Sequence, residues 1–79
     1  MLVSMEEKMA FHLITQLNSD FNFNKIDWEG HDKHAYYFKA LDENGVSIEL
    51  KITKPSHDYS FKELWYKYGE DWYFADNLN

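Results

Sequence analysis

Two histidines three positions apart are the residues whose types and spacing come closest to a metal site. His31 and His34 flank Asp32 in a polar stretch that has the features of a turn. Imidazole nitrogens at this spacing can supply two ligands of a zinc centre when two further ligands converge. The chain has no cysteine, so those ligands would have to be His57 or a carboxylate. A turn whose histidines point into water is the simpler interpretation, and we predict no metal and no cofactor.

Neighbouring carboxylates are the other candidates for chemistry, because paired acids can serve as general acid and base. The nearest pairs are Asp27 with Glu29 and Glu70 with Asp71. A solvated strand face explains the first pair, and a turn explains the second. The serines stand outside any nucleophile-elbow context, and the glycines form no phosphate-binding loop. We therefore predict no catalytic residue and expect that the protein is not an enzyme.

Length and composition indicate one small domain that spans residues 1–79. Six Phe, six Tyr and three Trp make up 19% of the chain, and each such side chain can bury about 150–250 Å². No apolar run approaches the roughly 20 residues of a membrane span. Acidic residues stand where a signal peptide would carry positive charge. We expect a cytoplasmic protein that does not bind membranes.

The charge of the chain argues against nucleic acid as a partner. Fourteen acids and eight bases give a formal net charge of −6, and every base is a lysine. An acidic surface repels the phosphate backbone. Arginine, which recognises phosphates and base edges through paired hydrogen bonds, is missing from the sequence.

The first element expected is an amphipathic helix from about Met5 to Asn18. Ser4 and Glu7 have the spacing of a capping box, in which each side chain bonds the backbone N–H of the other residue. Phe11 falls outside the apolar stripe of this helix. The stripe covers about half of the circumference, as expected for a helix that lies on a sheet, and it contains Met5, Met9, Ala10, Leu13, Ile14 and Leu17.

The next two segments predict strands. A strand is expected at about Lys25–Glu29, with a turn or bulge near Asn24-Lys25, because the phase of the apolar alternation changes there. Residues 46–53 alternate between apolar and polar, as in a strand with one buried face. They are expected to pair with a strand at 33–42.

Two loops compete for this central hairpin. A two-residue Asn-Gly loop is common in hairpins, but here it would waste the apolar face. A three-residue loop with Gly45 as a left-handed bulge residue places Phe38 opposite Leu50 and Lys39 opposite Glu49. Register follows the hydrophobic pattern where one face is buried, so we predict the three-residue loop.

The last third of the chain fits two structures. As a helix, it has a second capping box at 60–63 and apolar residues at helical spacing. As two strands, Tyr59–Tyr68 and Trp72–Asp76 are joined by a type II′ turn at Gly69-Glu70. We prefer the hairpin because its aromatic partners fall into place together. The expected pairs are Trp65 with Phe74, Tyr66 with Tyr73, and Leu64 with Ala75.

These elements predict an α+β fold in the order α-β-β-β-β-β. The N-terminal amphipathic helix packs on an antiparallel β-meander of four to five strands. The helix can cover only one face of the sheet, so surplus aromatic residues are expected on the other face. They either form cross-strand pairs that cover the open face or constitute a binding surface. The candidate binding residues are Tyr37, Trp65, Tyr66, Trp72 and Tyr73.

We therefore expect a small acidic protein that binds another protein, or a second copy of itself, through an aromatic sheet face. An inhibitor, an immunity-like protein or a protein of a phage or mobile element fits this size and charge. A rim of acids would suit a basic partner, and comprises Glu49, Glu63, Glu70, Asp71 and Asp76. The alternative is a small-ligand binder with a pocket between helix and sheet, lined by Met9, Leu13, Trp28 and Phe38.

Overall fold

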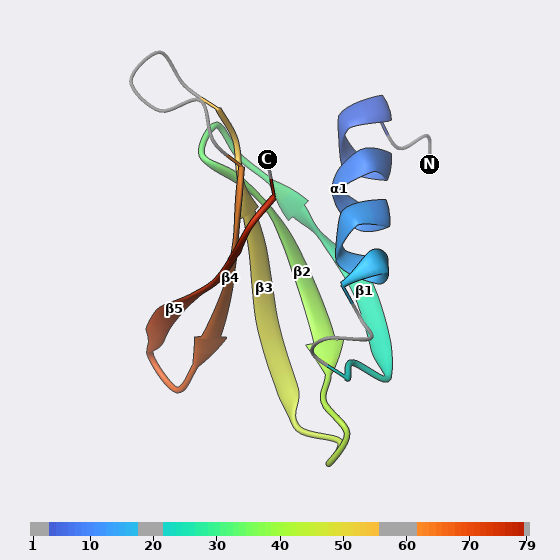
Figure 1. The fold of residues 1–79 in the computed structure, drawn as a ribbon, viewed down its shortest axis with the longest axis vertical. Coiled ribbons are helices and arrows are strands. Elements are labelled where there is room, and N and C mark those ends of the chain that lie inside the picture. The colour runs from blue at the N-terminus through green and yellow to red at the C-terminus, as the bar shows by residue number, and fades with distance from the viewer. Residues whose placement is uncertain (1–3, 18–21, 56–61, 79) are drawn as a thin grey trace.

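The computed structural model describes residues 4–17, 22–55 and 62–78 of the chain. One helix is followed by five strands that form a single antiparallel sheet in chain order, β1-β2-β3-β4-β5. Figure 1 shows the helix on one side of the sheet, beside β1 and β2, with β4 and β5 at the far end. The predicted α+β class, the element order and the meander are confirmed. The elements are α1 (Met5–Gln16), β1 (Lys25–His31), β2 (Ala35–Leu41), β3 (Ser47–Thr53), β4 (Glu63–Tyr68) and β5 (Asp71–Asn77).

The predicted capping box starts α1. The Glu7 N–H donates to Ser4 Oγ at 3.2 Å, and the Ser4 N–H donates to Glu7 Oε2 at 3.1 Å. The helix ends earlier than predicted, because Leu17 already forms its C-cap. Asn18, the predicted last residue, lies outside the described part of the chain.

The buried stripe of α1 is displaced from the predicted one. Ala10 and Ile14 are buried as expected, but Met5 and Met9 are 74% and 51% exposed. Phe11, which the helical wheel placed off the stripe, packs its ring 5.9 Å from that of Phe38 in β2. The helix therefore rests on the sheet through its middle and its Phe11 side.

The central hairpin has the predicted register. Phe38 pairs with Leu50 and Lys39 with Glu49 across β2 and β3. The Gly45 N–H donates to the Asp42 carbonyl at 3.0 Å, and Gly45 has a φ of 80°. This is the three-residue loop with a left-handed glycine, and the Asp42 carboxylate strengthens it by accepting from the N–H groups of Asn44 and Val46 at 2.8 Å.

The C-terminal segment forms the preferred hairpin rather than a helix over residues 62–78. Tyr68 pairs with Asp71 around a loop of Gly69 and Glu70. Gly69 has a φ of 68°, whereas Glu70 is not among the residues with positive φ. These signs identify the predicted type II′ turn.

One pair of this hairpin was predicted wrongly. Trp65 pairs with Phe74 and Tyr66 with Tyr73, as expected. Leu64, however, pairs with Asp76 instead of Ala75, because the register shifts between Leu64 and Trp65. The predicted start of this strand, at Tyr59, lies outside the described residues.

The first strand is longer than predicted and contains an unpredicted bulge. Asn22 has a φ of 54°, and the chain bends at Asn24, where a turn or bulge was predicted. A register shift between Trp28 and Gly30 then leaves Glu29 without a cross-strand partner. Gly30 has a φ of 146°, which a side chain would disfavour.

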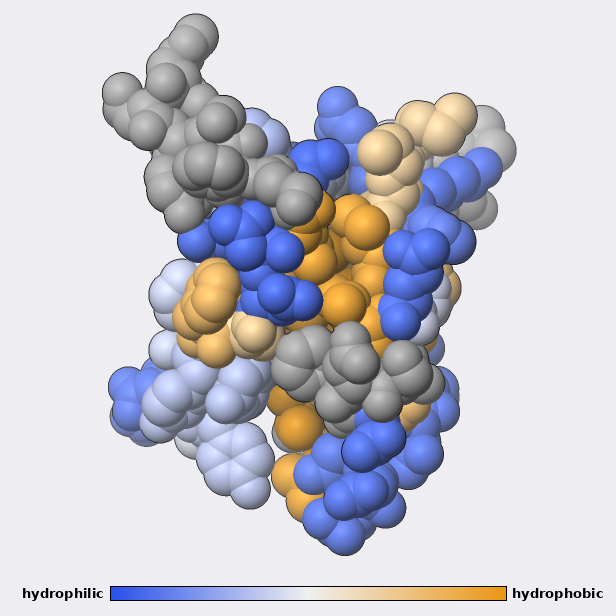
Figure 2. Space-filling view, in the orientation of Figure 1, coloured by the Kyte–Doolittle hydropathy of each residue, from blue (hydrophilic) through white to orange (hydrophobic). Residues whose placement is uncertain are grey.

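The core lies between α1 and the sheet. Cross-strand partners share a face, so the pairs that include Phe38, Leu50, Ile52 and Leu64 define the helix side. Figure 2 shows apolar side chains gathered between α1 and the C-terminal strands. No helix among the described residues is long and apolar enough to cross a membrane. The buried core cluster contains Ala10, Ile14, Phe23, Tyr36, Phe38, Ala40, Ile48, Leu50, Ile52 and Leu64.

Candidate functional site

The face of the sheet opposite α1 carries a cluster of aromatic side chains around one lysine. We call it the open-face cluster. Neighbouring residues of a strand point to opposite faces, so the residues next to helix-side residues point to the open face. Cross-strand pairing then brings these open-face side chains together. The cluster consists of Tyr37 in β2, Lys51 in β3, Trp65 in β4, and Trp72 and Phe74 in β5.

Lys51 forms the centre of the open-face cluster. Its Nζ lies 4.4 Å from the ring centroid of Trp72 and 5.8 Å from that of Trp65. An ammonium over an indole face is attracted by the negative face of the ring. Lys51 also pairs with Tyr37 on one neighbouring strand and with Trp65 on the other. The lysine therefore holds the two tryptophans in place.

Trp65 and Phe74 form the second contact of the cluster. Their rings meet edge to face, with centroids 5.6 Å apart. Trp65 Nε1 donates to Glu63 Oε1 at 3.2 Å, which fixes the indole. Phe74 is 51% exposed although it is fully apolar. The cluster thus presents a large apolar side chain to solvent beside two fixed indoles.

Tyr37 joins the cluster to the turn between β1 and β2. Its hydroxyl donates to Asp32 Oδ2 at 2.9 Å, while Asp32 Oδ1 accepts from the N–H groups of His34 at 2.7 Å and Ala35 at 3.0 Å. These bonds, led by that from His34, lower the pKa of Asp32 below its usual range. Burial, followed by the bond to Asp32, raises the pKa of Tyr37.

Two of the five predicted binding residues lie on the other face. Tyr66 pairs with Leu50, so it points to the helix side and packs against the core. Tyr73 pairs with Tyr66, and the two rings stack with centroids 5.5 Å apart. The predicted set is therefore divided: the structure brings Tyr37, Trp65 and Trp72 together on the open face and separates Tyr66 and Tyr73 from them.

Phe74 and Lys51 complete the cluster, although neither was predicted as a site residue. Phe74 follows Trp72 by two positions, so strand alternation alone could have indicated their common face. The predicted register of the central hairpin also places Lys51 opposite Tyr37, but no sequence pattern placed Trp72 above it. That contact spans three strands and depends on the register between β3 and β4.

The charges around the cluster are mixed rather than a purely negative rim. Glu49 and Glu63 lie on the open face, but Lys67 approaches Glu49 at 3.6 Å. Glu70 and Asp71 stand at the β4–β5 turn. Asp76 pairs with Leu64 and therefore belongs to the helix side.

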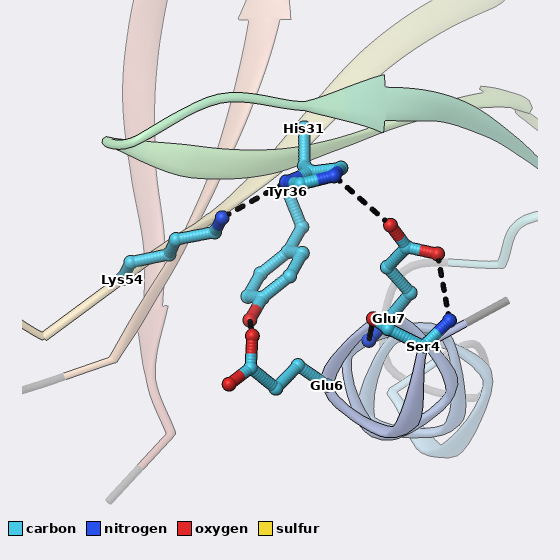
Figure 3. A network of polar contacts seen from close by, with 6 residues as sticks. All are labelled: Ser4, Glu6, Glu7, His31, Tyr36 and Lys54. Carbon is cyan, nitrogen blue, oxygen red and sulfur yellow. Dashed lines mark hydrogen bonds and ion pairs between the residues drawn. The ribbon is translucent and has the colours of Figure 1, made fainter.

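A separate polar network joins the start of α1 to the sheet (Figure 3). Glu7 Oε1 lies 3.1 Å from His31 Nε2, and Lys54 Nζ lies 3.0 Å from His31 Nδ1. Since an ammonium can only donate, Nδ1 accepts and Nε2 carries the hydrogen that faces Glu7. The sequence predicted the capping role of Glu7 but not this contact, which links distant segments.

Tyr36 extends this network on the helix side. Lys54 Nζ lies 4.5 Å from its ring centroid, and its hydroxyl donates to Glu6 Oε2 at 3.0 Å. Burial, with a further contribution from Glu6, raises the pKa of Tyr36 to about 12. The network fixes the first turn of α1 on the sheet.

No metal centre is evident in the part of the chain that the structure describes. No group of three or more His, Asp or Glu side chains there could hold a metal ion. His31 instead contacts Glu7 and Lys54, and Asp32 closes the turn that precedes His34. His57, the other possible ligand, lies outside the described residues.

Three grooves flank α1 where the alternative hypothesis expected one pocket. The largest, of about 580 Å³, lies between α1 and β1 and includes Phe11 and Trp28, and another of about 290 Å³ includes Phe11 and Phe23. The third, of about 230 Å³, includes Met9 and Leu13. The four residues predicted to line a single pocket are therefore not brought together, and Phe38 is buried beneath the helix.

Comparison of the chain with protein-family models, with curated proteins and with solved structures found no match in any of the three.

Proposed function

We propose that this chain is a non-enzymatic protein-binding module that acts through its open-face cluster. The observation that carries the proposal is the exposure of Phe74 beside two tryptophans on a face that no described element covers. Tyrosine and tryptophan are enriched among the residues that dominate interface energetics. Aromatic side chains also contribute contact area at low cost in conformational entropy.

Internal contacts support the proposal because they organise the surface in advance. Lys51 and Glu63 hold the indoles of Trp72 and Trp65. Side chains that are already fixed lose less entropy when a partner binds. A surface of this kind presents rigid anchors, with Phe74 as the most exposed apolar member.

The partner we propose is a protein with basic character. The chain carries a formal net charge of −6, which accelerates encounters with positively charged molecules. The open face around the cluster is nearly neutral, because Lys51 in the cluster and Lys67 beside it offset Glu49 and Glu63. Long-range attraction would therefore come from the whole chain and short-range contact from the aromatic side chains. A role as an inhibitor or an immunity-like protein fits this mode of binding.

Affinity capture with matched variants tests the proposal. The immobilised chain is expected to retain a partner from cells of the source organism, and Trp72→Ala and Phe74→Ala should each weaken that binding about tenfold or more. Val46→Ala is the matched control, because Val46 is an exposed apolar residue outside the cluster. Equal capture by Phe74→Ala and the wild-type chain would contradict the proposal, as would failure to capture any partner.

The largest groove beside α1 favours a second candidate function, the binding of a small ligand. Its volume of about 580 Å³ falls in the range of ligand pockets. It is an open groove rather than an enclosed cavity, so it would bury less of a ligand than typical pockets do. A fragment screen by NMR would test it, with amide shifts at Phe11 and Trp28 as the expected signature.

A further inference from the structure

The two edges of the sheet differ in how they are protected. Exposed strand edges attract other strands, and proteins discourage this with charges, bulges and covering elements. The β1 edge has charged residues at every second position, a bulge after Trp28, and α1 packed beside it. Its charged residues are Lys25, Asp27 and Glu29.

The β5 edge has little such protection along its middle. Four consecutive residues from Trp72 to Ala75 carry no charge. Two of them, Tyr73 and Phe74, are 45% and 51% exposed on opposite faces of the sheet. No strand of the described chain pairs with the outer side of β5. The edge therefore offers backbone groups flanked by apolar surface on both faces.

The hairpin register shows which backbone groups point outward. The pair next to a two-residue loop is hydrogen-bonded, and bonded and non-bonded pairs then alternate. Tyr68 with Asp71 and Tyr66 with Tyr73 are therefore the bonded pairs. The N–H and C=O groups of Trp72 and Phe74 point away from β4. Their side chains belong to the open-face cluster, so edge and cluster form one continuous surface.

Charge selects the occupant of this edge. Asp71 and Asp76 stand at the two ends of the apolar stretch, and neither forms an ion pair with a lysine among the described residues. A second copy of the chain would bring acidic strand ends against acidic strand ends in either orientation. Each molecule would also carry a net charge of −6. A strand with basic ends meets no such repulsion.

We propose that β5 is a docking edge, to which an extended segment of the partner adds as a sixth strand. The segment has lysine or arginine at both ends and alternating apolar residues between them. Its backbone pairs with Trp72 and Phe74, and its ends face Asp71 and Asp76. Its side chains on the open face lie beside the two aromatic rings. This inference rests on the proposed protein-binding function and specifies how the partner binds.

A titration of the ¹⁵N-labelled chain with a synthetic peptide tests the docking edge. The probe is Lys-Val-Thr-Val-Lys, whose two lysines lie on one strand face and whose valines lie on the other, and the control peptide has glutamate at both ends. We expect amide shifts at Trp72 and Phe74 with the lysine peptide and none with the glutamate peptide. The double variant Asp71→Lys/Asp76→Lys should bind the lysine peptide about tenfold more weakly, the effect of two surface ion pairs.

Two substitutions of Phe74 separate the edge from the cluster. Phe74→Ala removes the ring, whereas Phe74→Pro also removes the outward N–H and leaves the β4–β5 bonds in place. The proline variant should bind the lysine peptide more weakly than the alanine variant, with circular dichroism confirming that both fold. Asp27→Lys, on the β1 edge, is the control and should bind the lysine peptide as the wild-type chain does.

Several results would overturn the docking edge while leaving the proposed function intact. Equal partner capture by Phe74→Pro and Phe74→Ala would show that the partner uses the open face alone. Equal binding of both peptides, or no amide shift at β5 at millimolar peptide, would show that β5 does not select a segment with basic ends. If sedimentation experiments showed a dimer, and Phe74→Pro dissociated it, the β5 edge would bind a second copy of the chain instead. If every variant of the open-face cluster still captured the partner, the proposed function itself would be overturned.

Discussion

Asp32 shows how one exposed side chain organises a turn. Its carboxylate accepts from the backbone of His34 and Ala35 and from the hydroxyl of Tyr37. These bonds favour the charged carboxylate, which is why the pKa of Asp32 is lowered. In the sequence Asp32 was noted only as the residue between His31 and His34, and the structure gives it this local role in the turn.

Asp32→Asn should destabilise the protein near neutral pH. A depressed folded-state pKa adds stability above the unfolded value of about 3.8, and this stability is lost as pH falls through the lower folded value. The difference in unfolding free energy between wild type and variant should therefore shrink in acid. Urea unfolding from pH 7 to pH 2.5 measures it. A difference that stays constant with pH would show that charge at Asp32 contributes nothing.

The pKa of Tyr36 shifts in the opposite direction, because in the folded state it is raised to about 12. The neutral phenol is favoured in the fold, so its contribution is complete below about pH 10 and is lost as pH rises toward 12. Wild type should lose stability over this range faster than Tyr36→Phe does. Parallel urea unfolding curves from pH 8 to 11.5 compare them. Identical pH profiles would mean that the phenol is solvated in the fold.

At the scale of elements, the parts with strong local signals were predictable. The capping box placed the start of α1, and hydrophobic alternation with Gly45 fixed the register of β2 against β3. The type II′ turn at Gly69 gave most of the β4–β5 pairing. Each of these signals depends on residues close together in sequence.

Other features depend on contacts that no local pattern encodes. The pairing of β4 with β3 sends Tyr66 to the helix side, and nothing in the sequence fixes that register. Met5 and Met9 are exposed, while Phe11 packs against Phe38, a residue far away in the chain. The network around His31 likewise joins residues from three separate segments.

Gly45 tests the predicted loop of the central hairpin. An added Cβ would meet no atom within 4 Å, so any cost of Gly45→Ala comes from its φ of 80°. We expect a loss of about 1 kcal/mol, and a smaller loss for Gly45→Asn, because asparagine tolerates this region better. Thermal or urea unfolding measures both. Equal stability of all three proteins would contradict the left-handed conformation.

For the whole molecule, the arrangement of one helix on one side of a five-stranded sheet decides what is left to bind. The core is complete on the helix side, where Phe38, Leu50 and Ile52 are almost fully buried. The aromatic residues on the open face are therefore surplus to that core. Their exposure has an energetic cost in water that a bound partner would remove.

Stability and partner capture, measured on the same variant, test most directly whether the open-face cluster serves binding rather than folding. Trp72→Ala/Phe74→Ala should lose about 1–2 kcal/mol of unfolding free energy, against about 3–5 kcal/mol for Phe38→Ala in the core. The folded double variant should fail to capture the partner that wild type and Val46→Ala retain. Loss of stability equal to that of Phe38→Ala, or undiminished capture by the folded variant, would contradict the binding role.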